Sequence, residues 1–467
     1  MRRTLRENAP SALLACAGSA VLAWLTLGSY VWNDYDTEAR PAVEALVHGH
    51  LRTFLDLAPV YGGSLLERAP LALLPGLWSG GALAVYRLLA LPALASSVLL
   101  GVWLAARMRR RGQTILARGL AVALCVCNPV AIPALELGHA EELFGACACT
   151  IAVLLATRAR ARRFDGLLAG AVLGVAIANK DWAVLAAGPV LLALTPRARA
   201  AAAAAAVAVA GLLLSPLVLG ASGTFVASTR SLGAGASPIF QPWQVWWFLG
   251  HHGALVRGIS GPKPGYRTGP AWIESDSHLL IVLAALALAS ALWLALRMRT
   301  RDVVPRRLAG VLTRAGSAAT IGERARRGAG NGPVLAARLS EREALCALAV
   351  VMMSRFMLDT WDFVYYPLPF LIALVAWEVC EAPSRPPALA LLASALVWLT
   401  FQWLPGRVSP DAQAAAFLLW TVPLAMLLLA RLPWPGRAPQ TGGASATAGS
   451  RSSRPAQEMT VRSFGSP

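Results

Sequence analysis

The stretch Ala82–Ala106, ALAVYRLLALPALASSVLLGVWLAA, decides the fold of this chain. It contains one charged residue, Arg87, and the basic sequence RMRRR follows it directly at 107–111. A helix of about 20 apolar residues crosses the hydrocarbon core of a bilayer. The stretch therefore predicts a transmembrane helix whose basic end lies at a membrane surface.

Apolar runs of this kind recur along the chain, which is 57% hydrophobic and only 14% charged. Soluble domains usually carry about 25% charged residues. The runs lie at 11–32, 82–106, 119–136, 143–157, 166–178, 183–195, 201–220, 278–296, 344–358, 363–379, 388–404 and 413–430. We therefore expect an all-α fold, a polytopic integral membrane protein of about 12 transmembrane helices. The runs at 166–178 and 183–195 are short, and they fit either two short spans or a re-entrant hairpin.

The distribution of positive charge predicts how these helices are oriented. An N-terminus on the inner side, followed by strict alternation, places 31 of the 42 Lys and Arg residues inside. Because positive residues favour the cytoplasmic side, we expect a multi-pass protein of the cell (plasma) membrane with both termini in the cytoplasm. The net charge of +18 is spread over short loops without a continuous basic face, which argues against a nucleic-acid partner.

This topology divides the chain into a transmembrane domain, 1–431, and a tail, 432–467. The tail is rich in Ser, Gly, Ala and Pro, and such a composition predicts disorder. An insert at 297–343 contains eleven Arg residues and is also expected on the cytoplasmic side.

The first and the fourth extracytoplasmic loops, 33–81 and 221–277, are long. The first contains a predicted amphipathic helix from Glu38 to Leu57. By the same topology, 15 of the 24 Asp and Glu residues lie toward the outer side. Because acidic residues contribute little to topology, this excess indicates a function at the outer face.

Three carboxylates follow the first apolar run, in the sequence NDYDTE at 33–38. If Asp34 opens a helix, Asp34 and Glu38 share one face, and Asp36 lies between them. Repulsion and partial burial would raise the pKa of one carboxyl toward a value useful for a general base. Helix capping by Asn33 or Asp34 is an equally weighted alternative.

A second polar cluster, GHAEE at 138–142, falls in a tight outer turn. His139 and Glu142 are three residues apart, and they can share a hydrogen bond or bind a divalent cation, with Glu141 beside them. A solvated turn with capping acids is the competing interpretation. A divalent cation is therefore a candidate cofactor, and no metal ligand is assigned.

Further ionisable residues lie at the outer ends of other predicted spans, where charge at membrane depth indicates function. Arg355 and Asp359 are four residues apart, and they either neutralise each other or bind substrate. The predicted substrate-binding residues are His139, Glu141, Glu142, Lys180, Asp181, Arg355, Asp359, Asp362 and Tyr365. The cations that could bind a phosphate are Lys180, Arg257, Lys263, Arg267 and Arg355.

The chain resembles the GT-C superfamily of integral membrane glycosyltransferases, in which an acidic residue follows the first span and precedes an Ala-rich helix. It looks like the polyprenyl-phosphate-mannose-dependent, glycosyltransferase 87-like members of actinobacterial type. The stretches that carry this resemblance are DYDTEA at 34–39, ALVHG at 45–49, PVYGGS at 59–64, GHAEE at 138–142, NKDW at 179–182, DTWD at 359–362 and YY at 365–366. Here Tyr35 separates the two aspartates, so Asp34 and Asp36 both remain candidates for the base.

The resemblance implies a hexosyltransferase, a mannosyltransferase among the options, that acts at the extracytoplasmic face with inversion. A sugar (mannose or another hexose or pentose) would pass from a polyprenyl-phosphate donor to a glycan or glycolipid acceptor of the cell envelope. By this analogy Asp34 is the base, Asp36 and Glu38 support it, and Lys or Arg meets the charge of the leaving phosphate. Two alternatives stay open: a transporter or flippase of lipid-linked sugars, and a membrane scaffold without chemistry.

Overall fold

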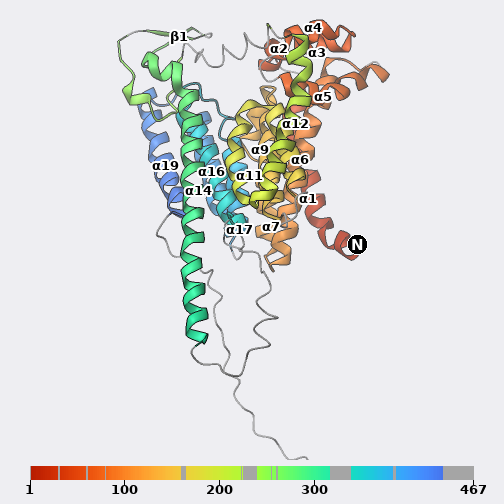
Figure 1. Ribbon diagram of the computed structural model, residues 1–467. Coiled ribbons are helices and arrows are strands. Elements are labelled where there is room, and N and C mark those ends of the chain that lie inside the picture. Colours follow the sequence, from red (N-terminus) through yellow and green to blue (C-terminus); the bar gives the residue numbers. More distant parts are fainter. Residues whose placement is uncertain are drawn as a thin grey trace, which may run out of the picture. The chain divides into compact units, whose positions relative to one another are not determined.

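The computed structural model is almost entirely helical (Figure 1). It describes residues 2–29, 32–58, 62–78, 80–158, 165–221, 223, 239–253, 255–258, 261–315, 338–381 and 385–434. Parts of the predicted stretches lie outside these ranges: residues 59–61 of PVYGGS, 224–238 of the fourth outer loop, 316–337 of the Arg-rich insert, and the tail from 435 onward.

The longer helices are α1 (Arg2–Leu27), α5 (Gly62–Leu73), α6 (Ala82–Arg110), α7 (Ile115–Val126), α9 (Ala140–Arg158), α10 (Asp165–Asn179), α12 (Pro196–Gly220), α14 (Ala271–Ala315), α16 (Glu341–Leu358), α17 (Leu368–Glu381), α18 (Ala388–Trp398) and α19 (Pro410–Arg431). The short helical segments are α2 (Asp34–Glu38), α3 (Arg40–Val47), α4 (Leu51–Leu57), η1 (Leu74–Trp78), α8 (Ala131–Glu136), η2 (Asp181–Ala186), α11 (Ala187–Ala193), η3 (Trp247–Leu249) and η4 (Leu399–Trp403). Two strands, β1 (Val256–Gly258) and β2 (Gly261–Lys263), form an antiparallel hairpin.

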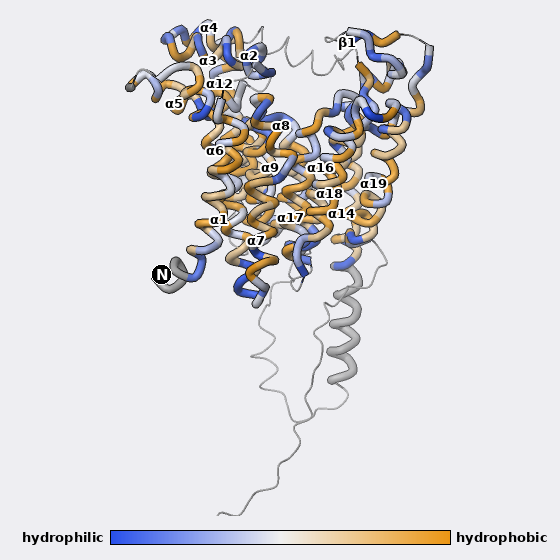
Figure 2. Tube along the Cα trace, turned by 180° about the vertical axis from the view of Figure 1, so that it is seen from behind, coloured by the Kyte–Doolittle hydropathy of each residue, from blue (hydrophilic) through white to orange (hydrophobic). Residues whose placement is uncertain are grey.

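Hydrophobic residues cover the middle of the long helices, and hydrophilic residues gather at their ends (Figure 2). Seven of the described helical segments are long and apolar enough to cross a membrane: Glu7–Leu27, Ala82–Arg110, Ile115–Glu136, Ala140–Arg158, Pro196–Gly220, Ala271–Arg299 and Pro410–Arg431. Shorter apolar helices cover Gly166–Asn179, Asp181–Ala193 and Ala388–Trp403. The predicted all-α, polytopic membrane fold is confirmed, whereas the number of about 12 spans stays a prediction.

Helices α10 and α12 pack through small residues. The contact is built from glycines and alanines that are spaced four apart on the two helices: Gly166, Gly170, Gly174, Ala198, Ala202 and Ala206. A Cβ atom at Gly170 would overlap the backbone carbonyl of Ala202. Such stretches of small residues let helix backbones approach closely in membranes, where packing replaces the hydrophobic driving force between helices.

Helix α10 and the following segment η2–α11 each extend between the end of the molecule where α9 begins and the end where α16 begins. Asn179, at the end of α10, donates to the backbone carbonyl of Glu141 at 2.9 Å. Leu192, near the end of α11, accepts from the backbone N–H of Leu339 at 3.0 Å, next to the start of α16. The two short runs therefore each reach from one end to the other, which favours two short spans over a re-entrant hairpin.

Arginine–glutamate pairs join helices at the end where α16 begins. They are Arg107–Glu341 at 2.6 Å, Arg299–Glu343 at 3.0 Å, Arg431–Glu381 at 3.0 Å and Arg342–Glu381. These pairs connect α6, α14, α16, α17 and α19 at their Arg-rich ends. The carboxylates of the candidate site described below lie at the opposite end of α16.

The helix predicted from Glu38 to Leu57 is divided into α2, α3 and α4. Gly49 adopts φ +79° after α3. The N–H of His50 bonds to the carbonyl of Ala45, and the N–H of Gly49 bonds to that of Leu46, at 2.8 and 2.9 Å. This pair of bonds is a Schellman motif, which ends a helix at a glycine in the left-handed conformation. The prediction of one continuous helix was therefore wrong because it passed over Gly49.

In the segment 221–277, the part that the structure describes is fastened to α19. Arg267 binds both carboxylate oxygens of Asp411, each at 2.9 Å. The indole N–H of Trp247 donates to the same carboxylate at 2.7 Å, and the side chain of Trp247 is buried against Phe240. Arg267, one of the predicted phosphate-binding cations, is thus paired within the fold, while Arg257 and Lys263 lie on the β1–β2 hairpin.

Candidate active site

Helix α2 places the three predicted acids in different surroundings. Asn33 caps the helix: its side chain accepts from the N–H of Tyr35, and the Asp36 carboxylate accepts from the N–H of Asn33, both at 3.0 Å. This capping box explains the position of Asp36, whose buried side chain also binds Arg40 at 2.9 Å. Glu38 is exposed. The side chain of Asp34 is 40% exposed, and its Oδ2 lies 3.4 Å from Nε2 of the buried His139. Of the three acids, Asp34 therefore is both accessible to solvent and in contact with the buried residues described below.

The turn before α9 lies directly against α2. Gly138 has φ +95°, a conformation that favours glycine. A Cβ atom at this position would collide with the Cβ and the backbone of Tyr35. The N–H of Tyr35 also donates to the carbonyl of Leu137 at 3.2 Å. Gly138 thus lets the start of α2, with Asp34, reach the first residues of α9.

Glu141, in the first turn of α9, has a fully buried side chain. Its Oε1 lies 2.8 Å from Nδ1 of His139 and 3.3 Å from Nζ of Lys180. Its Oε2 lies 3.6 Å from a terminal nitrogen of Arg68 on α5. A buried carboxylate needs compensating charges or hydrogen bonds, and here they come from three separate segments of the chain.

Glu142, also fully buried, forms the second centre of the cluster. Arg355 on α16 donates to both of its oxygens, at 3.1 and 3.2 Å. Lys180 and the indole N–H of Trp182 approach Oε1 at 3.0 and 3.2 Å. The guanidinium of Arg355 lies over the rings of Trp182 and Tyr366, at 4.7 and 4.6 Å from their centroids, so it is held by cation–π contacts as well.

Lys180 joins the two carboxylates, because it contacts Glu141 and Glu142 together. Its neighbour Asp181 does not enter the cluster. Asp181 is exposed, and its Oδ1 accepts the N–H of Trp182 at 2.7 Å where η2 begins. The predicted substrate-binding role of Asp181 therefore has no support from the geometry.

The turn between α16 and α17 contributes two acids and two tyrosines. Asp359 accepts the N–H of Trp361 at 2.9 Å and lies 3.6 Å from Nε2 of His278. Asp362 is completely buried, and neither of its carboxylate oxygens has a hydrogen-bond partner within the described chain. Burial, helped by nearby Asp359, raises the pKa of Asp362 well above its usual range, which favours the protonated acid. The ring of Tyr365 packs on His139 with centroids 4.5 Å apart.

Two of the predicted pairings were wrong. His139 bonds to Glu141 rather than to Glu142, because the side chain of Glu142 points to Arg355 and Lys180. Arg355 binds Glu142 instead of neutralising Asp359, four residues further on in the chain. Among the residues that the structure describes, no group of three His, Cys, Asp or Glu side chains is arranged to hold a metal ion.

Sequence reasoning missed Arg68, whose guanidinium is one of the three cations of the cluster. Arg68 donates to the backbone carbonyls of Ser64 and Leu89, at 2.9 and 3.1 Å, which fixes it between α5 and α6. A signal was present in the sequence: Glu67 and Arg68 interrupt an otherwise apolar run, SLLERAPLALL at 64–74. Charges within apolar segments indicate functional positions.

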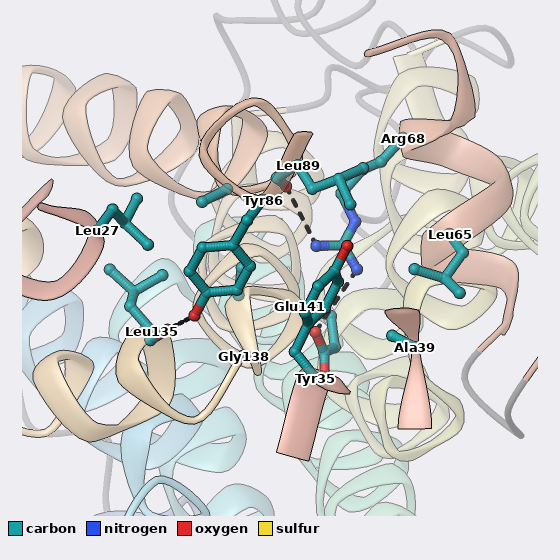
Figure 3. A pocket seen from close by; sticks show the side chains of 12 residues that line it. Leu27, Tyr35, Ala39, Leu65, Arg68, Tyr86, Leu89, Leu135, Gly138 and Glu141 are labelled. Carbon is teal, nitrogen blue, oxygen red and sulfur yellow. Dashed lines mark hydrogen bonds and ion pairs between the residues drawn. The ribbon is translucent and has the colours of Figure 1, made fainter. Parts of the chain in front are cut away.

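A small pocket opens beside this cluster (Figure 3). Its polar lining includes Arg68, Glu141, Tyr35 and Tyr86, and the hydroxyl of Tyr86 donates to the carbonyl of Leu135. The remaining lining is formed by Leu27, Ala39, Leu65, Leu89, Ala90, Leu135, Gly138 and Ala140. The pocket therefore combines an apolar wall with one positive and one negative group.

The charges of the cluster do not cancel. Two buried carboxylates, Glu141 and Glu142, face the three cations Arg68, Lys180 and Arg355. His139, whose contacts with Glu141 and Asp34 favour its protonated form, adds a fourth cation, and the partly exposed Asp34 on α2 adds a third carboxylate, so within the described residues one positive charge is in surplus. Preorganised charge in a site that excludes water can stabilise an anion that develops during a reaction.

These features define a polytopic membrane protein with a charged site at the end of its helices, where a carboxylate meets a surplus of cations. A family model described as glycosyltransferase family 87 matches residues 63–318, which is more than half of the 467 residues. The chain belongs to glycosyltransferase family 87, and it is a membrane glycosyltransferase. The matched segment includes Arg68, His139 and Lys180, whereas Asp34 and Arg355 lie outside it. No curated protein matches the chain.

Proposed function

We propose that this glycosyltransferase transfers a sugar from a polyprenyl-phosphate donor to a glycan or glycolipid of the cell envelope, with Asp34 as the general base. One observation carries the proposal. Asp34 is partly exposed, and it lies against a buried cluster whose cations outnumber its carboxylates. A base and a receptor for a leaving phosphate thus lie side by side.

The reaction would take place at the extracytoplasmic face of the plasma membrane. Asp34 lies at the opposite end of the helices from the Arg-rich segments around Arg107, Arg299 and Arg342. Because positive loops favour the cytoplasm, the candidate site would face outward, and both termini would lie inside. A donor whose sugar is carried on a lipid suits a site beside the bilayer.

In the transfer step, Asp34 takes the proton of the acceptor hydroxyl while that oxygen bonds to the anomeric carbon. The bond between this carbon and the phosphate oxygen breaks, and the polyprenyl phosphate leaves with the electron pair. Attack from the opposite side inverts the anomeric configuration. A positioned base contributes about 10²–10⁴-fold to such a rate, and orientation of the two substrates contributes the rest.

The charge changes of this step fit the cluster. The phosphodiester donor carries one negative charge, and the leaving monoester gains a second. Asp34 loses its charge at the same time, because it accepts the proton. The surplus positive charge of Arg68, Lys180 and Arg355 can therefore stabilise the phosphate without a change in the total charge of the site.

The decisive experiment compares Asp34→Asn with Asp56→Asn in proteoliposomes. The donors are radiolabelled polyprenyl-phosphate sugars that carry mannose, another hexose or a pentose. Asp56 is a matched control, an aspartate on α4 that is 48% exposed and paired with Arg52 at 4.0 Å. We expect Asp34→Asn to lower kcat by about 10²–10⁴-fold and Asp56→Asn to retain the wild-type rate. Full transfer by Asp34→Asn would exclude it as the base. Failure of the wild-type protein with every such donor would contradict the proposed donor class.

A further inference from the structure

His139 lies between two carboxylates that differ in their surroundings. Its Nδ1 is 2.8 Å from Oε1 of Glu141, and its Nε2 is 3.4 Å from Oδ2 of Asp34. The side chain of Glu141 is fully buried and also held by Lys180, whereas that of Asp34 is 40% exposed. The imidazole therefore links a fixed interior carboxylate to one that can be reached from outside.

The ring of His139 is held from its face as well as from its edges. The ring of Tyr365 packs on it with an interplanar angle of 32°, and the residue is buried. The preceding Gly138 takes the positive φ that brings Tyr35 and Asp34 against the turn. The direction of Nε2 toward Asp34 is thus determined by the packing of α2, α9 and the turn that contains Tyr365.

Both ring nitrogens face carboxylate oxygens, and ionised carboxylates only accept hydrogen bonds. The two carboxylates therefore favour a ring that carries a proton on each nitrogen, an imidazolium. Burial lowers the pKa of His139, and Lys180 lowers it further, but the bonds to Asp34 and Glu141 outweigh both and raise it to about 9. The groups that face the ring are Asp34 from α2, Glu141 from α9, Lys180 from the segment between α10 and η2, and Tyr365.

We propose that His139 is a positioning residue for Asp34, a role that rests on the proposed function. Its Nε2–H holds Oδ2 of Asp34, so that Oδ1 is presented to the acceptor hydroxyl. Its positive charge also lies between the carboxylates of Asp34 and Glu141, and it screens each from the other. The acceptor proton goes to Asp34 and then to solvent on the exposed side, while His139 keeps both of its protons throughout.

Two substitutions separate the contribution of the Nε2–H donor from that of the positive charge. The amide of Asn reaches about as far as Nδ1, so His139→Asn keeps a donor for Glu141 and loses the one for Asp34. The amide of Gln reaches about as far as Nε2, so His139→Gln keeps a donor for Asp34 and loses the charge. We expect kcat to fall about 100-fold in His139→Asn and about 10-fold in His139→Gln, with KM for the donor little changed. His48→Asn, at an exposed histidine that ends α3, is the matched control and should retain the wild-type rate.

The pH profile supplies a readout that a purely structural role would not change. Wild-type kcat should fall as the pH rises through about 9, where His139 loses its proton. In His139→Gln this alkaline limb should disappear, because the amide of Gln does not titrate. An unchanged kcat in His139→Asn, or an alkaline limb that persists in His139→Gln, would overturn the proposal.

A measurement without substrate separates this proposal from the proposed function. In protein labelled with ¹⁵N-histidine, the signal that is lost in His139→Gln should show an imidazolium that titrates near pH 9. In Asp34→Asn the pKa of this imidazolium should fall, because one of its two carboxylate partners is gone. A neutral ring at pH 7, or no change in Asp34→Asn, contradicts the link between His139 and Asp34. A positive result together with inactivity toward every lipid-phosphate sugar would contradict only the proposed function.

Discussion

Arg355 donates to both carboxylate oxygens of Glu142, at 3.1 and 3.2 Å, although 213 residues separate them in the chain. The pair joins α16 to the first turn of α9 and is almost completely buried, with side-chain exposures of 6% and 0%. A bidentate arginine–carboxylate pair fixes both the distance and the angle between its partners. It therefore sets the position of α9, and with it that of Glu141 and His139.

Glu142→Gln should be far more destabilising than a surface change of the same type. It leaves Arg355 and Lys180 in the interior with less compensating charge, which costs about 3–5 kcal/mol. Glu44→Gln removes an exposed partner of Arg40 and should cost less than about 1 kcal/mol. The free energies of unfolding can be compared in detergent micelles.

A double-mutant cycle with Arg355→Met tests the cause of that loss. Glu142→Gln combined with Arg355→Met should be less destabilised than the sum of the two single variants, because the unpaired cation is then absent. Additive losses would show that the two side chains do not depend on each other.

The membrane fold could be predicted because its signal is local. A run such as Ala82–Ala106 is long and apolar by itself, and no knowledge of its neighbours is needed. The glycine spacing of α10 was equally visible, since Gly166, Gly170 and Gly174 lie four residues apart, but its meaning depends on the alanines that face it on α12. The contact joins two separate apolar runs, so it cannot be predicted when each run is considered by itself.

The sequence indicated which end of the helices contains the candidate site, but not which of its side chains form pairs. Charged residues at the ends of apolar runs, such as His139 and Lys180, indicated the polar end of the helices. Spacing along one helix suggested partners for such residues, and for Arg355 it offered Asp359 as one of two alternatives. In a bundle, a buried cation instead takes the carboxylate that packing brings nearest, and for Arg355 that is Glu142. Arg68 was missed for the same reason, since its role depends on where α5 meets α6 and α9.

Gly138→Ala should separate α2 from the turn that carries His139. The new Cβ would collide with Tyr35, and the backbone would keep an unfavourable positive φ. Gly112→Ala introduces the same strain at φ +74°, but no atom lies within 4 Å of its Cβ position. We expect Gly112→Ala to cost about 1 kcal/mol with little effect on transfer.

Gly138→Ala should cost more in stability than Gly112→Ala and should lower kcat by about 100-fold, because Asp34 moves away from His139. Rates and unfolding free energies of the two variants in the same lipid provide the comparison. Equal rates would mean that the contact between Gly138 and Tyr35 does not position Asp34.

Gly170→Ala should weaken the contact between α10 and α12. The added methyl group would meet the backbone of Ala202, which cannot move aside as a side chain can. Overpacking of this kind usually costs about 1–3 kcal/mol. Gly211→Ala, on α12 itself, has no atom within 4 Å of the new Cβ, and better helix propensity should stabilise it by up to about 1 kcal/mol. Thermal unfolding of the two variants should therefore shift in opposite directions, and a shift in the same direction would contradict the packing argument.

Stability should decline with alkaline pH through His139. Its pKa in the folded protein is about 9, raised above the ordinary value of 6.5. The folded state therefore binds the proton more tightly than the unfolded state does. The resulting stabilisation is fully present below pH 6.5, and it is lost as the pH rises to about 9. The shift corresponds to a loss on the order of 3 kcal/mol.

The contribution of His139 to the pH dependence of stability can be isolated by comparing the wild type with His139→Gln, because the two proteins share all other titrating groups. The difference in unfolding free energy between wild type and His139→Gln should be largest near pH 6 and should shrink by pH 9.5, since only the wild type loses a buried imidazolium there. Unfolding titrations at several pH values in one detergent measure it. A difference that stays constant over this range would show that the ring is not charged in the folded protein, and Asp34 and Glu141 would then meet a neutral imidazole instead of a cation.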